Sequence, residues 1–331
     1  MQSIQRSLRT YRNEIKGFAI LWVVFFHAQL GLGGLLYDVQ KIGYGGVDIF
    51  FFLSGFGLFH SLSRNADPAD YLLRRAQRLL PAYLPFCLIW LAVMIPMNDL
   101  GLAGALRTVM GNLFMVGYFS QAPVQINWYP SALLLSLVLA PLFYGVLKSH
   151  TEKRAPVMIA ALLMMGIAFV GSDLYMVVSR LPVFAAGMMA AGWKSEKPGK
   201  GTLTAMLAAG FVLGMAALMI CYERYAELLS TYAMYWHPFL LIAPAMCAGL
   251  GWLFSLIPQK ALAPLRLLGK ASFEIFLFNA WVELLGKYYD LCEGRSQWLF
   301  WSAISVVLGV LYHLAVQWTA SQKMKKTQKR G

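Results

Sequence analysis

The feature that most constrains this chain is a succession of apolar segments, each about as long as a membrane is thick. About 20 apolar residues in a helix cross the hydrocarbon core of a bilayer. By this measure the sequence predicts ten membrane-spanning helices, at 17–36, 43–62, 79–97, 127–147, 156–171, 174–192, 203–222, 233–257, 270–290 and 297–319. The more polar residues 101–120 predict an interfacial or re-entrant helix. We therefore expect an all-α, polytopic membrane protein with one integral-membrane domain over residues 1–331 and no appended soluble domain.

The distribution of charge predicts the orientation of the chain. Only 13% of the residues are charged, against roughly 25% in soluble domains. Most of the 28 lysine and arginine residues lie before the first segment, after the last one and in every second loop between them. Basic loops stay in the cytoplasm, so both termini are predicted to be cytoplasmic. Because this charge follows topology and forms no single basic face, we expect no nucleic-acid partner.

The spacing of cysteine and histidine residues indicates no metal site. The four cysteines show neither CxxC nor CxxH spacing, so neither a disulfide framework nor a zinc site is predicted. No two histidines have metal-ligand spacing on one helix.

Polar side chains within the apolar segments are candidate functional groups, because they are costly inside a bilayer. His27 lies 11 residues after Lys16, roughly 16 Å along a helix from its cytoplasmic end. Ser54, in the stretch GVDIFFFLSGF, is predicted to reach a similar depth on the antiparallel second helix. Gly55 and Gly57 would let these two helices approach closely. We therefore expect His27 and Ser54 to lie near each other.

Other polar groups have more than one interpretation. Asp48, nearer the outer end of the second helix, suits either contact with an acceptor or anchoring at the interface. Asn127 could position a carbonyl group or an acceptor. Trp128 could stack on a sugar ring or belong to the interfacial aromatic belt. The polar residues of the last spans, Glu274, Asn279 and His313, are expected to serve helix packing.

The segment RRAQRLLP places two arginines on one helix face. Arg75 and Arg78 are three residues apart, at the predicted cytoplasmic surface. Paired guanidinium groups suit a phosphate ligand, which they bind through forked, charge-assisted hydrogen bonds. The alternative is a positive-inside anchor that attracts anionic lipid.

Taken together, these segments resemble the membrane acyltransferase-3 family, bacterial enzymes that often O-acylate cell-surface glycans. EIKGFAILWVVFFH is similar to the family's first-helix motif, a basic residue followed 11 positions later by histidine. GYGGVDIFFFLSGF is similar to its second motif, and Arg75, Arg78 and Pro81 form its R-x-x-R-x-x-P motif. NWYPSALLLSLVLAPL, RLPVFAAGMMAAG and LGKASFEIFLFNAW are similar to later landmarks. Three positions depart from the family: Lys16 replaces a usual arginine, Asn13 stands where an acidic residue is common, and Asn279 replaces a frequent histidine.

The resemblance implies an enzyme of the bacterial inner membrane that moves an acyl group, acetyl by family default, from acyl-CoA to a hydroxyl of a cell-surface or lipid-linked carbohydrate. It implies His27 as the catalytic base, through direct attack or an acyl-histidine intermediate. Arg75 and Arg78, with Lys16, would bind the phosphates of acetyl-CoA. Ser54, Asp48, Asn127 and Trp128 are the candidate lining residues. The expected partners are membrane lipid, acyl-CoA and the carbohydrate acceptor, without a metal.

Two other classes of function remain open from the sequence. A transporter or flippase for a lipid-linked glycan would carry helix-broken pairs in two related halves, and no such repeat is visible in the sequence. A non-catalytic scaffold of a glycan-assembly complex would tolerate alanine at Arg75 and Arg78.

Overall fold

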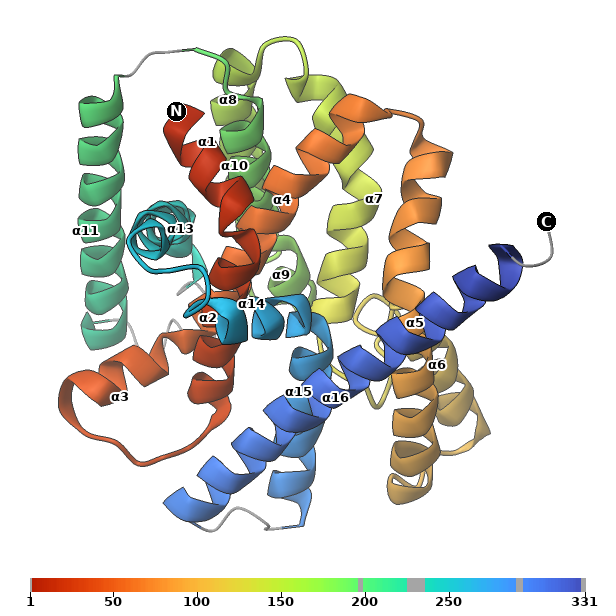
Figure 1. Cartoon of the computed structure of the whole chain (residues 1–331). Helices are drawn as coiled ribbons and strands as arrows, with labels where there is room; N and C mark the ends of the chain where they lie inside the picture. Colours follow the sequence, from red (N-terminus) through yellow and green to blue (C-terminus); the bar gives the residue numbers. More distant parts are fainter. Residues whose placement is uncertain (1, 196–198, 225–235, 290–293, 329–331) are drawn as a thin grey trace.

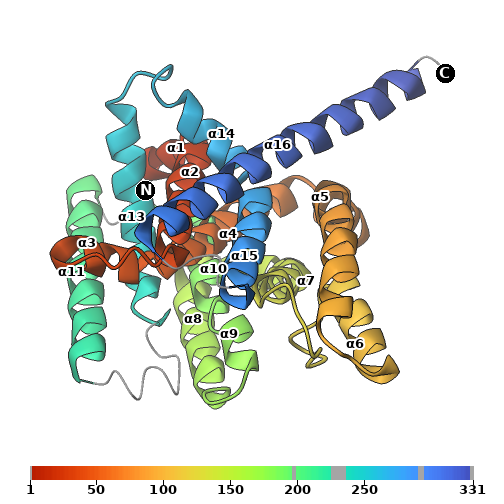
Figure 2. The ribbon, with the colours of Figure 1, turned by 90° about the horizontal axis from the view of Figure 1, so that it is seen from below.

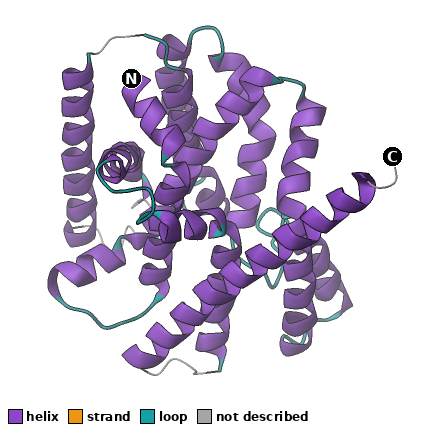
Figure 3. Cartoon of the chain, viewed as in Figure 1, coloured by secondary structure: helices purple, strands orange, loops and turns teal. Residues whose placement is uncertain are grey.

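The computed structural model of the chain describes residues 2–195, 199–224, 236–289 and 294–328. Throughout these residues the regular elements are helices and none is a strand (Figure 1 and Figure 3), so the predicted all-α class is confirmed. The elements are α1 (Gln2–Thr10), α2 (Arg12–His27), α3 (Gly34–Lys41), the 3-10 helix η1 (Gly43–Gly45), α4 (Gly46–Arg64), α5 (Pro68–Met97), α6 (Leu102–Leu113), α7 (Tyr129–Leu147), α8 (Thr151–Ala168), α9 (Leu174–Val178), α10 (Leu181–Gly192), α11 (Lys200–Arg224), α13 (Phe239–Ser255), α14 (Ala263–Lys270), α15 (Ser272–Tyr288) and α16 (Arg295–Gln328).

Six of the described helical stretches are long and apolar enough to cross a membrane. They are Gly34–Arg64, Pro68–Met97, Tyr129–Leu147, Leu174–Gly192, Lys200–Glu223 and Arg295–Gln322. The other four predicted spans overlap α2, α8, α13 and α15, although residues 233–235 and 290 lie outside the described residues. The count of ten spans and the cytoplasmic termini therefore stay predictions.

The sequence predicts one continuous helix over 17–36, and this prediction is wrong. Instead α2 ends at His27, and α3 begins at Gly34. The intervening turn contains Gly31 at φ 55°, and Gly34 follows at φ 59°, a region that glycine enters without steric cost. His27 is therefore the last residue of its helix and lies beside a loop.

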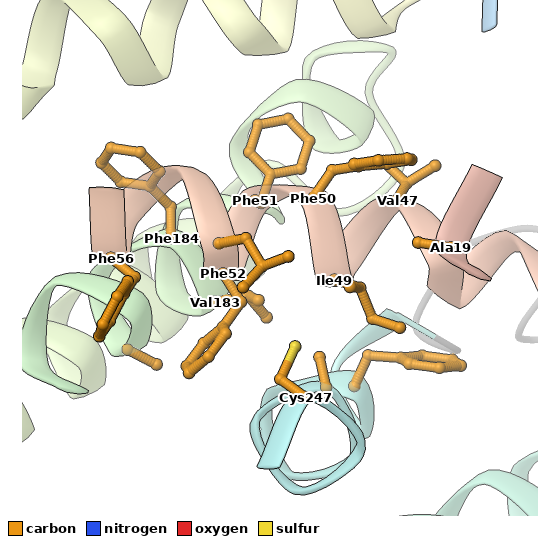
Figure 4. Close-up of a cluster of buried hydrophobic side chains, with 14 of the residues drawn as sticks. Ala19, Val47, Ile49, Phe50, Phe51, Phe52, Phe56, Val183, Phe184 and Cys247 are labelled. Atoms are coloured by element: carbon orange, nitrogen blue, oxygen red, sulfur yellow. The ribbon is translucent and has the colours of Figure 1, made fainter. Parts of the chain in front are cut away.

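The closest helix contacts lie at glycines, but the helix pairs differ from the pair that the sequence predicts. Gly55 of α4 lies against the backbone carbonyl of Phe184 on α10, and Gly187 of α10 lies against that of Phe52, so neither position has room for a Cβ. Figure 4 shows the surrounding core, in which Ile49 of α4 points toward Cys247 of α13. The expected contact of Gly55 with the first helix is wrong.

Contact between α2 and α4 is made nearer the start of α4. Gly43 and Gly46 lie against the backbone carbonyls of Trp22 and Ala19, and neither has room for a Cβ. Gly57 instead lies beside the guanidinium of Arg12. The backbones of the two helices therefore come closest near the His27 cavity described below, away from Ser54.

Helix α14 fixes the position of α15 relative to α2. The backbone of α14 touches that of α2 at Gly17 and Gly269, where a Cβ would not fit. The buried Glu14 carboxylate accepts a hydrogen bond from Arg266 Nε at 2.6 Å. Because α15 follows α14 directly, this contact brings α15 alongside α2, while α5 and α6 lie toward one flank (Figure 2).

Candidate functional site

Two cavities share a wall residue, Phe276 of α15. The larger has a volume of about 650 Å³, and the smaller, which contains His27, about 290 Å³. The ring of Phe276 packs on that of Tyr129, which lines the larger cavity, with 4.5 Å between the ring centroids. An aromatic pair therefore lies where the two cavities adjoin.

Five basic side chains line the larger cavity, termed here the basic cavity. Arg12 and Lys16 come from α2, Arg75 and Arg78 from α5, and Lys270 from the end of α14. The structure thus brings together Lys16, Arg75 and Arg78, the three residues predicted to bind a donor. Arg12 and Lys270 were missed, although Arg12 is four residues before Lys16 and so on the same helix face.

Arg12 and Arg75 are held in place by neutral oxygen atoms. Arg75 Nη2 donates a hydrogen bond to Ser61 Oγ at 2.6 Å, and Arg12 Nη2 donates to the Leu53 carbonyl at 3.1 Å. In the part of the chain that the structure describes, no carboxylate forms an ion pair with either guanidinium. Their positive charge is therefore available to an anionic ligand.

A histidine–glutamate pair lies in the same cavity. His313 Nδ1 is 2.9 Å from Glu274 Oε1, and both side chains are largely buried. Helix packing was the expected role of both residues, yet both line the basic cavity. Ser54 also lines this cavity.

The smaller cavity is built around the imidazole of His27. His27 Nδ1 lies 2.6 Å from Asn279 Oδ1, and Nε2 lies 3.5 Å from Glu283 Oε2. Asn279 and Glu283 are four residues apart on α15 and so share a face of that helix. Glu283 was missed in the sequence, where its spacing from Asn279 was the available signal.

The predicted lining residues divide between the cavities. Asn127 and Trp128 line the His27 cavity, but Ser54 does not, so the expected proximity of His27 and Ser54 is wrong. The reason is the register of α4. Val47 lines the His27 cavity, and Ser54 follows two turns later, roughly 10 Å farther along the helix.

Asp48 lines neither of the two cavities. Its carboxylate oxygen Oδ1 lies 3.5 Å from Arg180 Nε, and both side chains are at most 1% exposed. Burial rules out anchoring at the membrane interface, one of the two expected roles. The Arg180 guanidinium lies 5.0 Å from the ring centroid of Trp128, which lines the His27 cavity. Asp48 is thus connected to the lining of the His27 cavity through its ion pair with Arg180.

The described residues contain no group of three His, Cys, Asp or Glu side chains arranged to hold a metal ion. The site instead combines a basic cavity, an imidazole between an amide and a carboxylate, and an aromatic pair between them.

The helical fold and its long apolar helices define a polytopic membrane protein. A family model described as an acyltransferase domain matches residues 13–316, nearly the whole chain and both cavities. The chain therefore belongs to the acyltransferase-3 family and is a membrane acyltransferase in general terms. Comparisons with curated proteins and with solved structures gave no match.

Proposed function

We propose that this protein transfers an acyl group, acetyl in the simplest case, from acyl-CoA to a hydroxyl of a cell-surface or lipid-linked carbohydrate at the bacterial inner membrane. The observation that carries the proposal is the pair of cavities that share Phe276, one basic and one containing His27. A transferase needs such a pair, because donor and acceptor must reach one reacting centre.

The basic cavity supports a phosphate-bearing donor. Its five positive side chains include Arg75 and Arg78, whose planar guanidinium groups form two parallel hydrogen bonds to a phosphate. Coenzyme A carries phosphates at one end and its thioester at the other. With the phosphates on these arginines, the thioester arm would extend past Tyr129 and Phe276 toward His27.

The His27 cavity supports acceptance of a hydroxyl group. In the proposed step the acceptor O–H proton passes to His27, the acceptor oxygen bonds to the acyl carbon, and the carbon–sulfur bond breaks. The leaving thiolate takes up this proton from His27, which gives free CoA and returns the imidazole to its neutral form. Transfer through an acyl-histidine would use the same imidazole as the nucleophile in place of the base.

The remaining lining of the His27 cavity is suited to a sugar. Gln125 and Asn127 are amide side chains, which can both donate hydrogen bonds to hydroxyls and accept them. Trp128 adds an aromatic ring, on which a sugar ring could stack.

The test compares surface glycans from a strain lacking the protein with the same strain carrying wild type or His27→Ala. We expect mass spectrometry to show an acyl mass lost on deletion, restored by wild type and not by His27→Ala at equal membrane levels. Full restoration by His27→Ala would exclude the imidazole as base or nucleophile.

A second measurement separates an enzyme from a transporter. Purified wild-type protein given acetyl-CoA and a glycan extract should release free CoA, whereas a flippase or scaffold would release none. Unchanged glycans on deletion together with no CoA release would overturn the proposed function.

A further inference from the structure

We infer that Asn279 and Ser305 fix which ring nitrogen of His27 carries the proton, and so make Nε2 the nitrogen that accepts one. The tautomer of His27 follows from the geometry alone, whereas its effect on catalysis rests on the proposed function. That geometry is a chain of hydrogen bonds that runs from α16 through α15 to the end of α2.

The chain begins at Ser305 on α16. Its hydroxyl donates to the backbone carbonyl of Ser302, one turn earlier, at 2.7 Å. A serine hydroxyl has one proton, so the oxygen presents only lone pairs to its other neighbours. Close packing holds this group against α15, because Gly309, four residues farther along, lies against the backbone of Ile275 without room for a Cβ.

The hydroxyl of Ser305 sets the orientation of the Asn279 amide. Asn279 Nδ2 lies 3.4 Å from Ser305 Oγ, and both side chains are buried. Because Ser305 Oγ is an acceptor toward this neighbour, the NH₂ end of the amide must face it. The carbonyl oxygen Oδ1 is then the atom that faces His27. The oxygen and nitrogen of an amide side chain have nearly the same shape, so its orientation is assigned from its hydrogen-bond partners, here Ser305.

The amide oxygen in turn sets the tautomer of His27. Oδ1 can only accept, so the ring nitrogen 2.6 Å away, Nδ1, must carry the hydrogen. A neutral imidazole has one N–H, and Nε2 is therefore the nitrogen with a lone pair. Nε2 is also the nitrogen near Glu283 in the cavity.

Glu283 completes the arrangement after proton transfer. When Nε2 takes the proton of the acceptor hydroxyl, the imidazolium has an acceptor at each nitrogen: Asn279 Oδ1 on one side and Glu283 Oε2 on the other. A fixed negative charge beside a charge that develops during the reaction stabilises the transition state. Asn279 and Ser305 are thus positioning residues that act through His27.

The direct test is ¹⁵N NMR of protein labelled in its five histidines and held in lipid bilayers at alkaline pH, where imidazole is neutral. The His27 signals are those missing from His27→Ala. We expect wild type to show protonated Nδ1 and bare Nε2, and Asn279→Leu to lose this preference. Asn279→Asp, which keeps an oxygen acceptor, should retain it. Protonated Nε2 in wild type, or an unchanged tautomer in Asn279→Leu, would overturn the inference.

Kinetics test the consequence for catalysis. Asn279→Leu should lower kcat roughly 100-fold or more and leave the KM for acyl-CoA unchanged, because the donor cavity is separate. Asn279→Asp should restore most of kcat. Ser305→Ala should lower kcat, whereas Ser321→Ala should not: Ser321 lies on the same helix and also donates to a carbonyl three residues earlier, at 2.7 Å. Equal effects of the two serine substitutions would contradict the inference.

These measurements separate the inference from the proposed function. The tautomer is measured without substrate, so it is decided even if the protein releases no CoA. Conversely, acyl transfer with protonated Nε2 would leave the proposed function standing and remove the role of Asn279 and Ser305.

Discussion

Asp48 is linked to the lining of the His27 cavity through one buried arginine, although it does not line the cavity itself. Its carboxylate is paired with Arg180, whose guanidinium also lies against the rings of Trp128 and Trp236. Removal of one member of a buried ion pair is strongly destabilising in general, and costs more than the pair itself contributes. The sequence shows an intramembrane carboxylate, but its partner is 132 residues away and becomes evident only in the fold.

Substitution of Asp48 by asparagine should destabilise the protein. We expect Asp48→Asn to lower the free energy of unfolding by about 3 kcal/mol, measured by thermal unfolding in detergent, because Arg180 is left buried beside a neutral amide. Adding Arg180→Met should recover part of the loss. The control is Asp38→Asn on the exposed face of α3, which should change stability little. Equal stability of Asp48→Asn and wild type would contradict this account.

Glu283 is expected to contribute its charge to the reaction. Glu283→Gln keeps the size of the side chain but removes the carboxylate 3.5 Å from His27 Nε2. We expect roughly a tenfold to hundredfold fall in kcat for CoA release, with little change in the KM for the donor. The matched control is Glu223→Gln at the exposed end of α11. A fall of the same size in both variants would argue against a local effect at His27.

At the scale of helices, the sequence predicts which segments are helical. It does not predict which helices contact each other, or at which residues. Apolar length and the positions of polar residues locate the segments that contain α4, α5, α7 and α16, since these depend on local composition. Depth along a helix, counted from Lys16 and Gly43, does not predict that His27 and Ser54 line different cavities. Their separation depends on where α2 crosses α4, which glycine contacts set.

The contact of α4 with α10 gives a prediction at this scale. Gly55→Ala should destabilise the protein by about 1–3 kcal/mol, because the added methyl group would meet the Phe184 carbonyl. Gly145→Ala on α7, where nothing lies within 4 Å of the added carbon, should be neutral or slightly stabilising, as alanine favours helices. Thermal unfolding of the two variants checks the difference. A Gly55→Ala protein as stable as Gly145→Ala would mean that the helices lie farther apart.

At the scale of the molecule, the candidate site residues divide between two cavities that share Phe276. The arginines of the basic cavity come from segments predicted to be cytoplasmic, and Asn127 and Trp128 of the His27 cavity begin a helix predicted to start outside. The sequence predicts Arg75 and Arg78 as a pair because they share a helix face, and Lys16 joins them only through the resemblance to the family's first-helix motif. The spacing of Glu283 from Asn279 is visible in the sequence, but the contacts of Glu283 and Ser305 depend on the packing of α15 and α16, which the sequence does not show.

Orientation can be tested with single cysteines in a variant that lacks the four native ones. Ser63→Cys, beside the basic end of α4, should react with an impermeant maleimide only after the membrane is opened. Ser120→Cys, in the loop after α6, should react in intact spheroplasts. Both serines are exposed, so accessibility should reflect membrane side alone. Labelling of both residues from the same side would refute the predicted orientation.

The ring contact between Tyr129 and Phe276 has a consequence for the cell as a whole. Two polar cavities that meet inside a membrane would, if joined, form a leak for protons and small ions, and the energy stored across the membrane would drain through every copy of the protein. The two aromatic rings, tilted at 43° with their centroids 4.5 Å apart, offer an ion no polar group. Under the proposed function, the acyl group is apolar and would pass these rings more readily than an ion would.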